Sequence, residues 1–493
     1  MGRRDALLRL SIMAALLLGG AMAPVFAADV KNLSVTVSSG TQANAYGGYT
    51  IEEGASALQN ALTLSGPAKV LGASAGGWSR WGNAEWNTLT IRLDEDGLLG
   101  PSDIVGGGVA ESEGGGAAVH NTVYIESGTV EGTVEGGVAV GINGVGDGTG
   151  DVLSNQVTMS GGTVYSVFGG ETGEGNANDN VVTIKGSAAV TGKSNAVYGG
   201  YTIDGNASGN IVNIEDDADI HGEIMGGYTR AGSLISGNKV NVTGGNVNEN
   251  TVYGVYTAYG DVLDNQAVIK GTGQAGSSDT NSVYAGFTNI GAAAGNILYI
   301  QDSAEIAGSA FAGYQGGFIS SETVERNQVF MSGGSVNGDL TGGGSNNGGE
   351  TLNNYVEITG GTVSGNVYSG FTDSADALEN TLTVAGGRVE GSLFGGYSNT
   401  GTANENKLTF SAGTAGSDAY GGYAQEGADK NEAVLSGTSV LEGNAAGGSS
   451  ARGEASGNSL TIKENSEVKG DAAGGDVYMG TISKNIITIQ YNA

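Results

Sequence analysis

The densest group of residues able to do chemistry is acidic and occupies one short stretch. Asp216, Asp217, Asp219, His221 and Glu223 follow one another closely. Side chains two positions apart share a face of a strand, so Asp217, Asp219 and Glu223 are expected on one face together with His221. Paired carboxylates serve acid/base hydrolysis of glycosides, and carboxylate oxygens are the ligands that Ca²⁺ takes. A solvated outward face explains the same pattern, so these three residues are candidate Ca²⁺ ligands and we predict no catalytic residue and no cofactor.

The three tryptophans form a second candidate site. Trp78, Trp81 and Trp86 all fall in residues 72–104, the least repetitive stretch of the chain. Such a cluster packs as an elaboration of a terminal cap, or it offers aromatic surfaces to a ligand such as a sugar. Both interpretations stay open.

Other ligand motifs are weak or missing from the sequence. Residues 146–151 read Gly-Asp-Gly-Thr-Gly-Asp, which is a single approximate copy of a calcium-binding repeat that works only when copies are stacked. No phosphate-binding Gly-x-x-x-x-Gly-Lys-Ser/Thr loop is present, and the glycine-rich runs are not followed by a helical pattern. We therefore expect a protein that is not an enzyme.

These candidates lie on a repeat that accounts for nearly the whole chain. An Asn recurs from Asn60 to Asn485 at a mean spacing of about 28 residues, and apolar residues follow it at the second and fourth positions, as Val182 and Ile184 follow Asn180. This alternation predicts a half-buried strand. The recurrent Asn either forms a ladder of side-chain amides between repeats or supplies the left-handed conformation of a turn.

A second block in each repeat places aromatic residues on both sides of paired glycines, as in Tyr198-Gly199-Gly200-Tyr201-Thr202. Paired Gly in a strand indicates a bend or a close backbone approach, and the aromatic rings are expected to stack on those one repeat away. With a third short piece such as Val363-Ser364-Gly365, each repeat has two or three short strands. The sequence predicts an all-β protein, a single elongated β-solenoid of about 16–17 coils of about 28 residues.

The N-terminus reads as an export signal. Arg3, Arg4 and Arg9 precede a short apolar run over 10–18, and small residues follow up to Ala28. Residues 1–28 are therefore predicted to be a signal peptide, and no further segment reads as a transmembrane span. Residues 29–104 are expected to form capping and irregular coils, and residues 105–493 regular solenoid repeats that end inside a repeat.

Composition agrees with an exported rod and excludes some partners. The chain has a formal charge of −31 and no Cys, so ladder hydrogen bonds and stacking, not disulfides, must hold the fold. A surface this acidic repels nucleic acid and anionic membranes, and no basic patch interrupts it.

In its signal peptide and its Asn-x-Val-x-Ile, Gly-Gly-x-Val-x-Gly and Val-Tyr-Gly-Gly-Tyr blocks, the chain resembles the passenger region of autotransporter (type V secretion) proteins. The resemblance implies a right-handed parallel β-helix brought to the cell surface by an outer-membrane barrel, often for adhesion or biofilm formation. Such a barrel has alternating membrane strands, which this sequence lacks. We therefore expect a barrel in cis beyond Ala493, a barrel in trans on another polypeptide, or free secretion.

The sequence thus predicts an exported, surface-associated or secreted adhesin or structural stalk. Host matrix, glycan or sister-cell surfaces are the expected partners, and loops over 93–118, 141–154, 271–281 and 312–325 the expected contact regions. The alternatives are a polysaccharide lyase or hydrolase on a β-helix, using Asp217 and Asp219, and a purely structural surface-layer or spacer protein.

Overall fold

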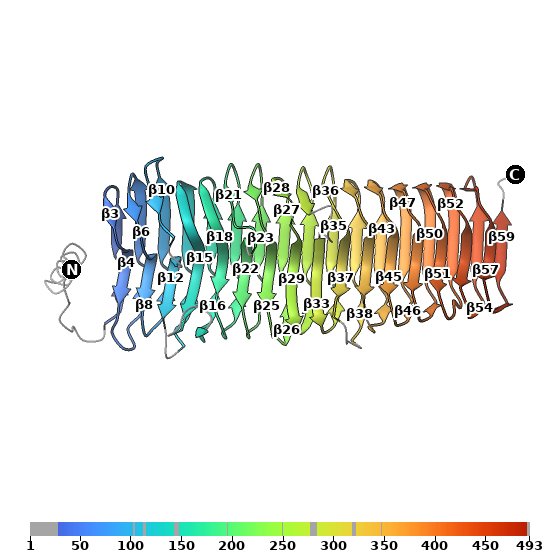
Figure 1. The fold of residues 1–493 in the computed structure, drawn as a ribbon, viewed down its shortest axis with the longest axis horizontal. Coiled ribbons are helices and arrows are strands. Elements are labelled where there is room, and N and C mark those ends of the chain that lie inside the picture. Colours follow the sequence, from blue (N-terminus) through green and yellow to red (C-terminus); the bar gives the residue numbers. More distant parts are fainter. Residues whose placement is uncertain are drawn as a thin grey trace.

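The computed structural model describes residues 28–101, 104–111, 115–141, 147–194, 196–248, 250–276, 283–317, 322–346 and 348–490. Over these residues the chain is all-β, and it winds into one parallel β-solenoid of about 16 turns, with coils roughly 27 residues apart (Figure 1). The predicted fold class is confirmed. The predicted signal peptide lies, apart from Ala28, outside the described residues.

One coil has four strands. In the coil that begins after Asn354 they are β43 (Tyr355–Ile358), β44 (Thr362–Val363), β45 (Val367–Thr372) and β46 (Ala377–Leu378). Each pairs in parallel with its equivalent one coil further on. The expected two or three strands occur in some coils, such as residues 180–209, whereas others add a fourth strand of two or three residues that shows no alternation of its own.

The remaining strands fall into the same four series, and some neighbouring strands of a coil are merged. The first strands are β2 (Ser34–Val37), β6 (Ala61–Gly66), β10 (Thr88–Leu93), β14 (Thr122–Ser127), β17 (Gln156–Met159), β20 (Val181–Ile184), β23 (Ile211–Ile214), β27 (Lys239–Val242), β31 (Gln266–Ile269), β35 (Ile297–Ile300), β39 (Gln328–Met331), β47 (Thr381–Val389), β50 (Lys407–Ala415), β52 (Glu432–Leu441), β55 (Ser459–Lys463) and β59 (Ile486–Gln490). The second strands are β3 (Thr41–Gln42), β7 (Lys69–Val70), β11 (Leu98–Leu99), β21 (Ala189–Val190), β24 (Asp219–Ile220), β28 (Asn246–Asn248), β32 (Gln274–Gly276), β36 (Glu305–Ile306), β40 (Ser335–Val336) and β56 (Glu467–Val468). The third strands are β4 (Ala45–Thr50), β8 (Ser74–Ser79), β12 (Val105–Glu111), β15 (Thr129–Val140), β18 (Thr163–Glu171), β22 (Val197–Thr202), β25 (Ile224–Thr229), β29 (Val252–Tyr259), β33 (Val283–Ile290), β37 (Ala310–Gln315), β41 (Leu340–Ser345), β48 (Leu393–Ser398), β51 (Ala419–Ala424), β53 (Ala445–Ser450) and β57 (Ala472–Val477). The fourth strands are β1 (Val30–Lys31), β5 (Ala57–Leu58), β9 (Ala84–Glu85), β13 (Ala118–Val119), β16 (Val152–Leu153), β19 (Ala177–Asn178), β26 (Leu234–Ser236), β30 (Asp261–Leu263), β34 (Ala293–Ala294), β38 (Val324–Glu325), β42 (Thr351–Leu352), β49 (Ala403–Asn404), β54 (Glu454–Ser456) and β58 (Thr481–Ser483).

The interior is one continuous apolar column along the rod. The alternating residues of the first strands point into it, and Val182 and Ile184 are fully buried there. The leading residue of the third strand, such as Val197, closes the core from the opposite side. The predicted period-2 alternation is confirmed, and each coil completes its core only by stacking on its neighbours.

The recurrent Asn residues form a buried ladder. The Oδ1 of Asn354 accepts hydrogen bonds from the backbone N–H and the Nδ2 of Asn327, each at 3.0 Å. The Nδ2 of Asn354 in turn donates to Asn380 Oδ1 and to the backbone oxygen of Val324. The left-handed conformation belongs to the residue just before each ladder Asn, here Asn353 with φ 55°. Of the two interpretations, the ladder is correct and the turn interpretation is wrong.

In the first coil the apolar residues Val35 and Val37 follow Asn32 by three and five positions, one more than in the later repeats. Asn32 has φ 57° and occupies the left-handed position, whereas Leu33 occupies the ladder position. The backbone N–H of Leu33 donates to Asn60 Oδ1, so the amide ladder starts at Asn60.

Paired glycines and ladder Asn residues depend on each other. A Cβ added to Gly200 would lie 2.6 Å from the Nδ2 of Asn210, closer than carbon can approach. Val255 takes the equivalent position in β29, and there the Nδ2 of Asn265 stretches to 3.3 Å from its usual acceptor and also bonds its own coil. A Cβ added to the first glycine, Gly199, would lie 2.3 Å from the backbone oxygen of Gly226, so the expected close backbone approach at Gly-Gly is confirmed.

Candidate functional site

Two columns of side chains run along the outside of the third strands. We call the position before the paired glycines the first ring column and the position after them the second ring column. From β18 to β51 the first ring column reads Phe168, Tyr198, Met225, Tyr253, Tyr284, Phe311, Thr341, Tyr368, Phe394 and Tyr420. Over the same strands the second ring column reads Glu171, Tyr201, Tyr228, Tyr256, Phe287, Tyr314, Gly344, Phe371, Tyr397 and Tyr423.

Rings within a column stack face to face. The centroids of Phe168 and Tyr198 are 4.8 Å apart at 7°, and those of Tyr201 and Tyr228 are 4.8 Å apart at 5°. Between columns the contact is edge to face, as between Tyr198 and Tyr201 at 86°. The predicted stacking from one repeat to the next is confirmed. Because neighbours cover the ring faces, a continuous column offers mainly ring edges to solvent.

The first ring column is broken at two places between Phe168 and Tyr420. Met225 lies between Tyr198 and Tyr253, and Thr341 lies between Phe311 and Tyr368. At Met225 the thioether side chain takes the place of a ring, and Tyr198 beside it stays buried at 1% exposure. At Thr341 the space is filled again, because Gly344 leaves room in the second column and Tyr314 lies against it.

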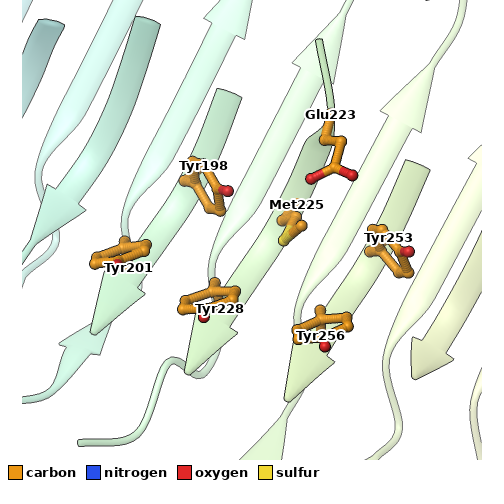
Figure 2. Close-up of a pocket in the computed structure, with 7 residues that line it drawn as sticks. All are labelled: Tyr198, Tyr201, Glu223, Met225, Tyr228, Tyr253 and Tyr256. Atoms are coloured by element: carbon orange, nitrogen blue, oxygen red, sulfur yellow. The ribbon is translucent and has the colours of Figure 1, made fainter. Parts of the chain in front are cut away.

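The break at Met225 is a groove of about 350 Å³ lined by both columns. Figure 2 shows Met225 between Tyr198 and Tyr253, with the second column alongside and the carboxylate of Glu223 at one edge. Met225 is only 4% exposed and packs in one apolar cluster with the rings of Phe168 and Tyr198. The groove is therefore lined by five tyrosines, one thioether and one carboxylate, and the ring of Tyr198 is buried beneath its surface.

Charge in this groove is negative and poorly solvated. Burial raises the pKa of Glu223 above its ordinary range, and the carboxylate makes no ion pair or side-chain hydrogen bond with the described residues. Burial also raises the pKa of Tyr198 and Tyr253, with Glu223 adding to both shifts, so these phenols stay neutral. Arg230, in the turn that follows β25, is already in an ion pair with Asp204 at 2.9 Å.

A second acidic feature interrupts the columns further towards the N-terminus. Glu135 of β15 is 1% exposed and takes the first-column position next to Phe168. Glu171 of β18 takes the second-column position one coil on, and the two carboxyl groups hydrogen-bond to each other. Burial raises the pKa of Glu171 from 4.5 to about 7, and the bond with Glu135 partly offsets the rise. A carboxyl group must be protonated to donate in such a pair.

This pair predicts a pH-dependent stability that Glu171→Gln should remove. Between pH 4.5 and 7 the folded chain holds a proton that the unfolded chain has lost, so the free energy of unfolding should fall as pH rises, by at most about 3 kcal/mol. Amide hydrogen exchange in β15 and β18 at pH 5 and pH 8 measures it. In Glu171→Gln the local difference should vanish, while the exposed control Glu131→Gln on the same strand should keep it. An unchanged slope in Glu171→Gln would contradict the assignment.

The predicted acidic ligand set is dispersed. Asp217 is exposed in the turn before β24, and Asp219 pairs with His221 at 2.9 Å on the outside of the rod. Glu223 lies beyond the corner, in the groove. Among the described residues no three acidic, His or Cys side chains group as metal ligands.

The tryptophans also separate. Trp78 is buried in the second-column position of β8, against Tyr46 at 5.4 Å and Tyr49 at 6.5 Å. Trp81 lies in the following turn, under the guanidinium of Arg80. Trp86 is 56% exposed in the left-handed position before Asn87, where it stacks on His120 at 4.2 Å. Trp78 thus packs against its neighbours, as one interpretation predicted. The interpretation of the three tryptophans as a ligand site stays a prediction.

Several other predicted regions lie partly outside the described residues. These are the loops 93–118, 141–154, 271–281 and 312–325, and the Gly-Asp repeat at 146–151. In the described part of the chain, no helix is long and apolar enough to cross a membrane. Comparison with protein families, curated proteins and solved structures finds no match for this chain.

Sequence reasoning missed the groove and the carboxyl pair. Met225-Gly226-Gly227-Tyr228 looks like an ordinary variant of the aromatic block, and its meaning appears only once the rings on either side are known to stack. A usable signal was present, since Met225 stands in a column of aromatic residues with Glu223 two positions before it.

Proposed function

We propose that the protein is an exported cell-surface rod that acts as an adhesin or structural stalk and has no enzymatic activity. The observation that carries the proposal is the repetition of one bonding pattern along the rod, from Asn60 to Asn485. Such a scaffold is rigid and holds outward side chains and loops at fixed intervals, which suits multivalent contact with host matrix, glycan or a sister cell. An outer-membrane barrel in cis or in trans, as in the resembled autotransporters, would anchor it.

The hydrolase alternative receives no support from the carboxyl pair of Glu135 and Glu171. The carboxyl groups of Glu135 and Glu171 are in hydrogen-bond contact. Glycosidases hold their two carboxyl groups about 5 Å or more apart so that a sugar or a water fits between them. This pair is better suited to packing between coils.

Binding of the purified chain to matrix proteins, a glycan array and whole cells tests the adhesin proposal. Replacing the loops at 141–154 and 312–325 by the short turns of regular coils should abolish binding. The matched control removes one whole coil, residues 354–379, which shortens the rod and leaves the loops in place, so binding should persist. If the loop-replaced rod adheres as well as the intact one, or if neither binds any surface, the adhesin proposal fails and a spacer is the better account.

A further inference from the structure

We propose that the outer face of the first strands binds the surface of an uncharged crystalline polysaccharide. We call outer face the residues at the first and third positions of every first strand, such as Thr381 and Thr383 of β47. The inference concerns the coils themselves and does not depend on the proposed adhesin function, which assigns contact to the loops. It rests on the geometry, the charge and the chemical groups of this face.

The outer face is regular along the whole rod. The 17 first strands, from β2 to β59, pair in one register at these positions, so two columns of side chains follow the straight rod (Figure 1). Paired strands lie about 4.8 Å apart. All the side chains except that of Val268 are at least partly exposed. The face is therefore a long, rigid strip that presents its side chains to solvent at fixed intervals.

This strip is almost free of charge, although the chain has 51 acidic residues and a formal charge of −31. Its charged residues are two lysines and two glutamates, whose charges cancel: Lys239, Glu357, Lys407 and Glu432. Charges return at its border, as in the ion pair of Arg92 with Glu126. An anionic partner is repelled by the rest of the chain, and a cationic partner finds more acidic residues elsewhere on it. The partner that fits the outer face is therefore uncharged.

The groups on the outer face match those of a sugar. Thr, Ser, Asn and Gln supply most of its side chains, and their hydroxyls and amides both donate and accept hydrogen bonds, as sugar hydroxyls do. The Nδ2 of Asn241 donates to the Oδ1 of Asn213 at 2.7 Å, so these amides are aligned along the column. Three consecutive coils add aromatic rings, with Tyr299 and Phe330 5.4 Å apart and Phe330 and Tyr355 6.0 Å apart. Such rings offer apolar contact to the carbon-bound hydrogens of sugar rings.

A crystal surface fits this face better than a dissolved chain. A dissolved polysaccharide loses conformational freedom when it is laid along a rigid strip, and that loss opposes binding. The chains at the surface of a crystal are already ordered, so this cost is absent. Weak contacts repeated on 17 coils then add up, because all of them form together.

Depletion of the purified chain from solution by suspended microcrystals tests the proposal. The probes are crystalline cellulose, crystalline chitin, and cellulose crystals whose surface hydroxymethyl groups have been oxidised to carboxylates. At least one of the two neutral crystals should bind the chain, and at least about tenfold more tightly than the oxidised crystals. Absence of binding to both neutral crystals, or equal binding to the oxidised ones, overturns the proposal.

A triple variant locates the contact on the outer face. Three glutamates on this face should weaken binding to the neutral crystals at least about tenfold: Thr90→Glu, Thr158→Glu and Thr383→Glu. The matched control adds the same charge at partly or fully exposed positions of the second-strand columns and should leave the affinity unchanged: Thr129→Glu, Thr163→Glu and Thr362→Glu. Equal losses in the two triple variants would refute the assignment to the outer face.

A second variant and the loop-replaced rod complete the test. Tyr299→Thr combined with Phe330→Thr removes two rings and should also weaken binding, which keeps the test decisive if circular dichroism shows that the triple glutamate variant misfolds. The loop-replaced rod of the adhesin test should bind the crystals as tightly as the intact chain. Loss of crystal binding in that rod refutes the outer face as the site, whereas its binding to cells bears only on the adhesin proposal.

Discussion

Ile358→Asp should unfold the coils around β43, at a cost of about 5 kcal/mol or more. Ile358 is 1% exposed, and in register it stacks between Met331 and Val384 of the neighbouring coils. The substitution removes those apolar contacts and places a carboxylate among the apolar side chains of the core. Each coil obtains its core from its neighbours, so the damage should spread to β39 and β47 before it fades.

Amide hydrogen exchange and limited proteolysis across residues 328–389 measure this effect directly. The matched control is Thr359→Asp, one residue further on, which adds the same charge at an exposed position and should change stability by less than about 0.5 kcal/mol. The defect should shrink as pH is lowered towards 4, because the buried carboxyl then gains a proton. Normal protection in Ile358→Asp at pH 7 would refute the strand register described above.

The repeat made the fold predictable, because a 28-residue period with alternating apolar residues has few solutions other than a solenoid. The first strand of each coil can be predicted from its two buried apolar residues, such as Val182 and Ile184. The role of the Asn was undecided, since Asn fits both a ladder and a left-handed turn. Only the backbone shows that Asn353 has the turn conformation and Asn354 the ladder position.

The candidate site was not predictable to the same degree, because it depends on which residues lie beside each other in neighbouring coils. Glu135 and Glu171 are joined across coils of unequal length, on strands β15 and β18 whose register shifts earlier, between Val130 and Thr133. The acidic stretch that looked strongest is divided by a corner, which sends Asp219 to one side and Glu223 to the other. The alternation of residue types along this stretch does not predict such a corner.

Asn354→Ala should destabilise the rod by about 4 kcal/mol, although Asn353→Ala, one residue away, should cost only about 1 kcal/mol. Loss of the Asn354 amide leaves two donors of Asn327 without their acceptor and the backbone oxygen of Val324 without its donor. These groups are buried, so water does not replace the lost bonds. Asn353 is exposed, so the cost of Ala at this position is mainly the strain of a left-handed backbone.

Comparing the two variants by hydrogen exchange in β39, β43 and β47 separates a ladder from a turn. Protection should drop on both sides of Asn354→Ala, because its amide bonds the coil before it and the coil after it. In Asn353→Ala the loss should stay within its own corner, and Asn353→Gly should restore full protection, since Gly adopts a positive φ without strain. If the two Ala variants lose protection equally, the recurrent spacing of these residues reflects turn geometry, and the side-chain ladder adds little to the stability of the rod.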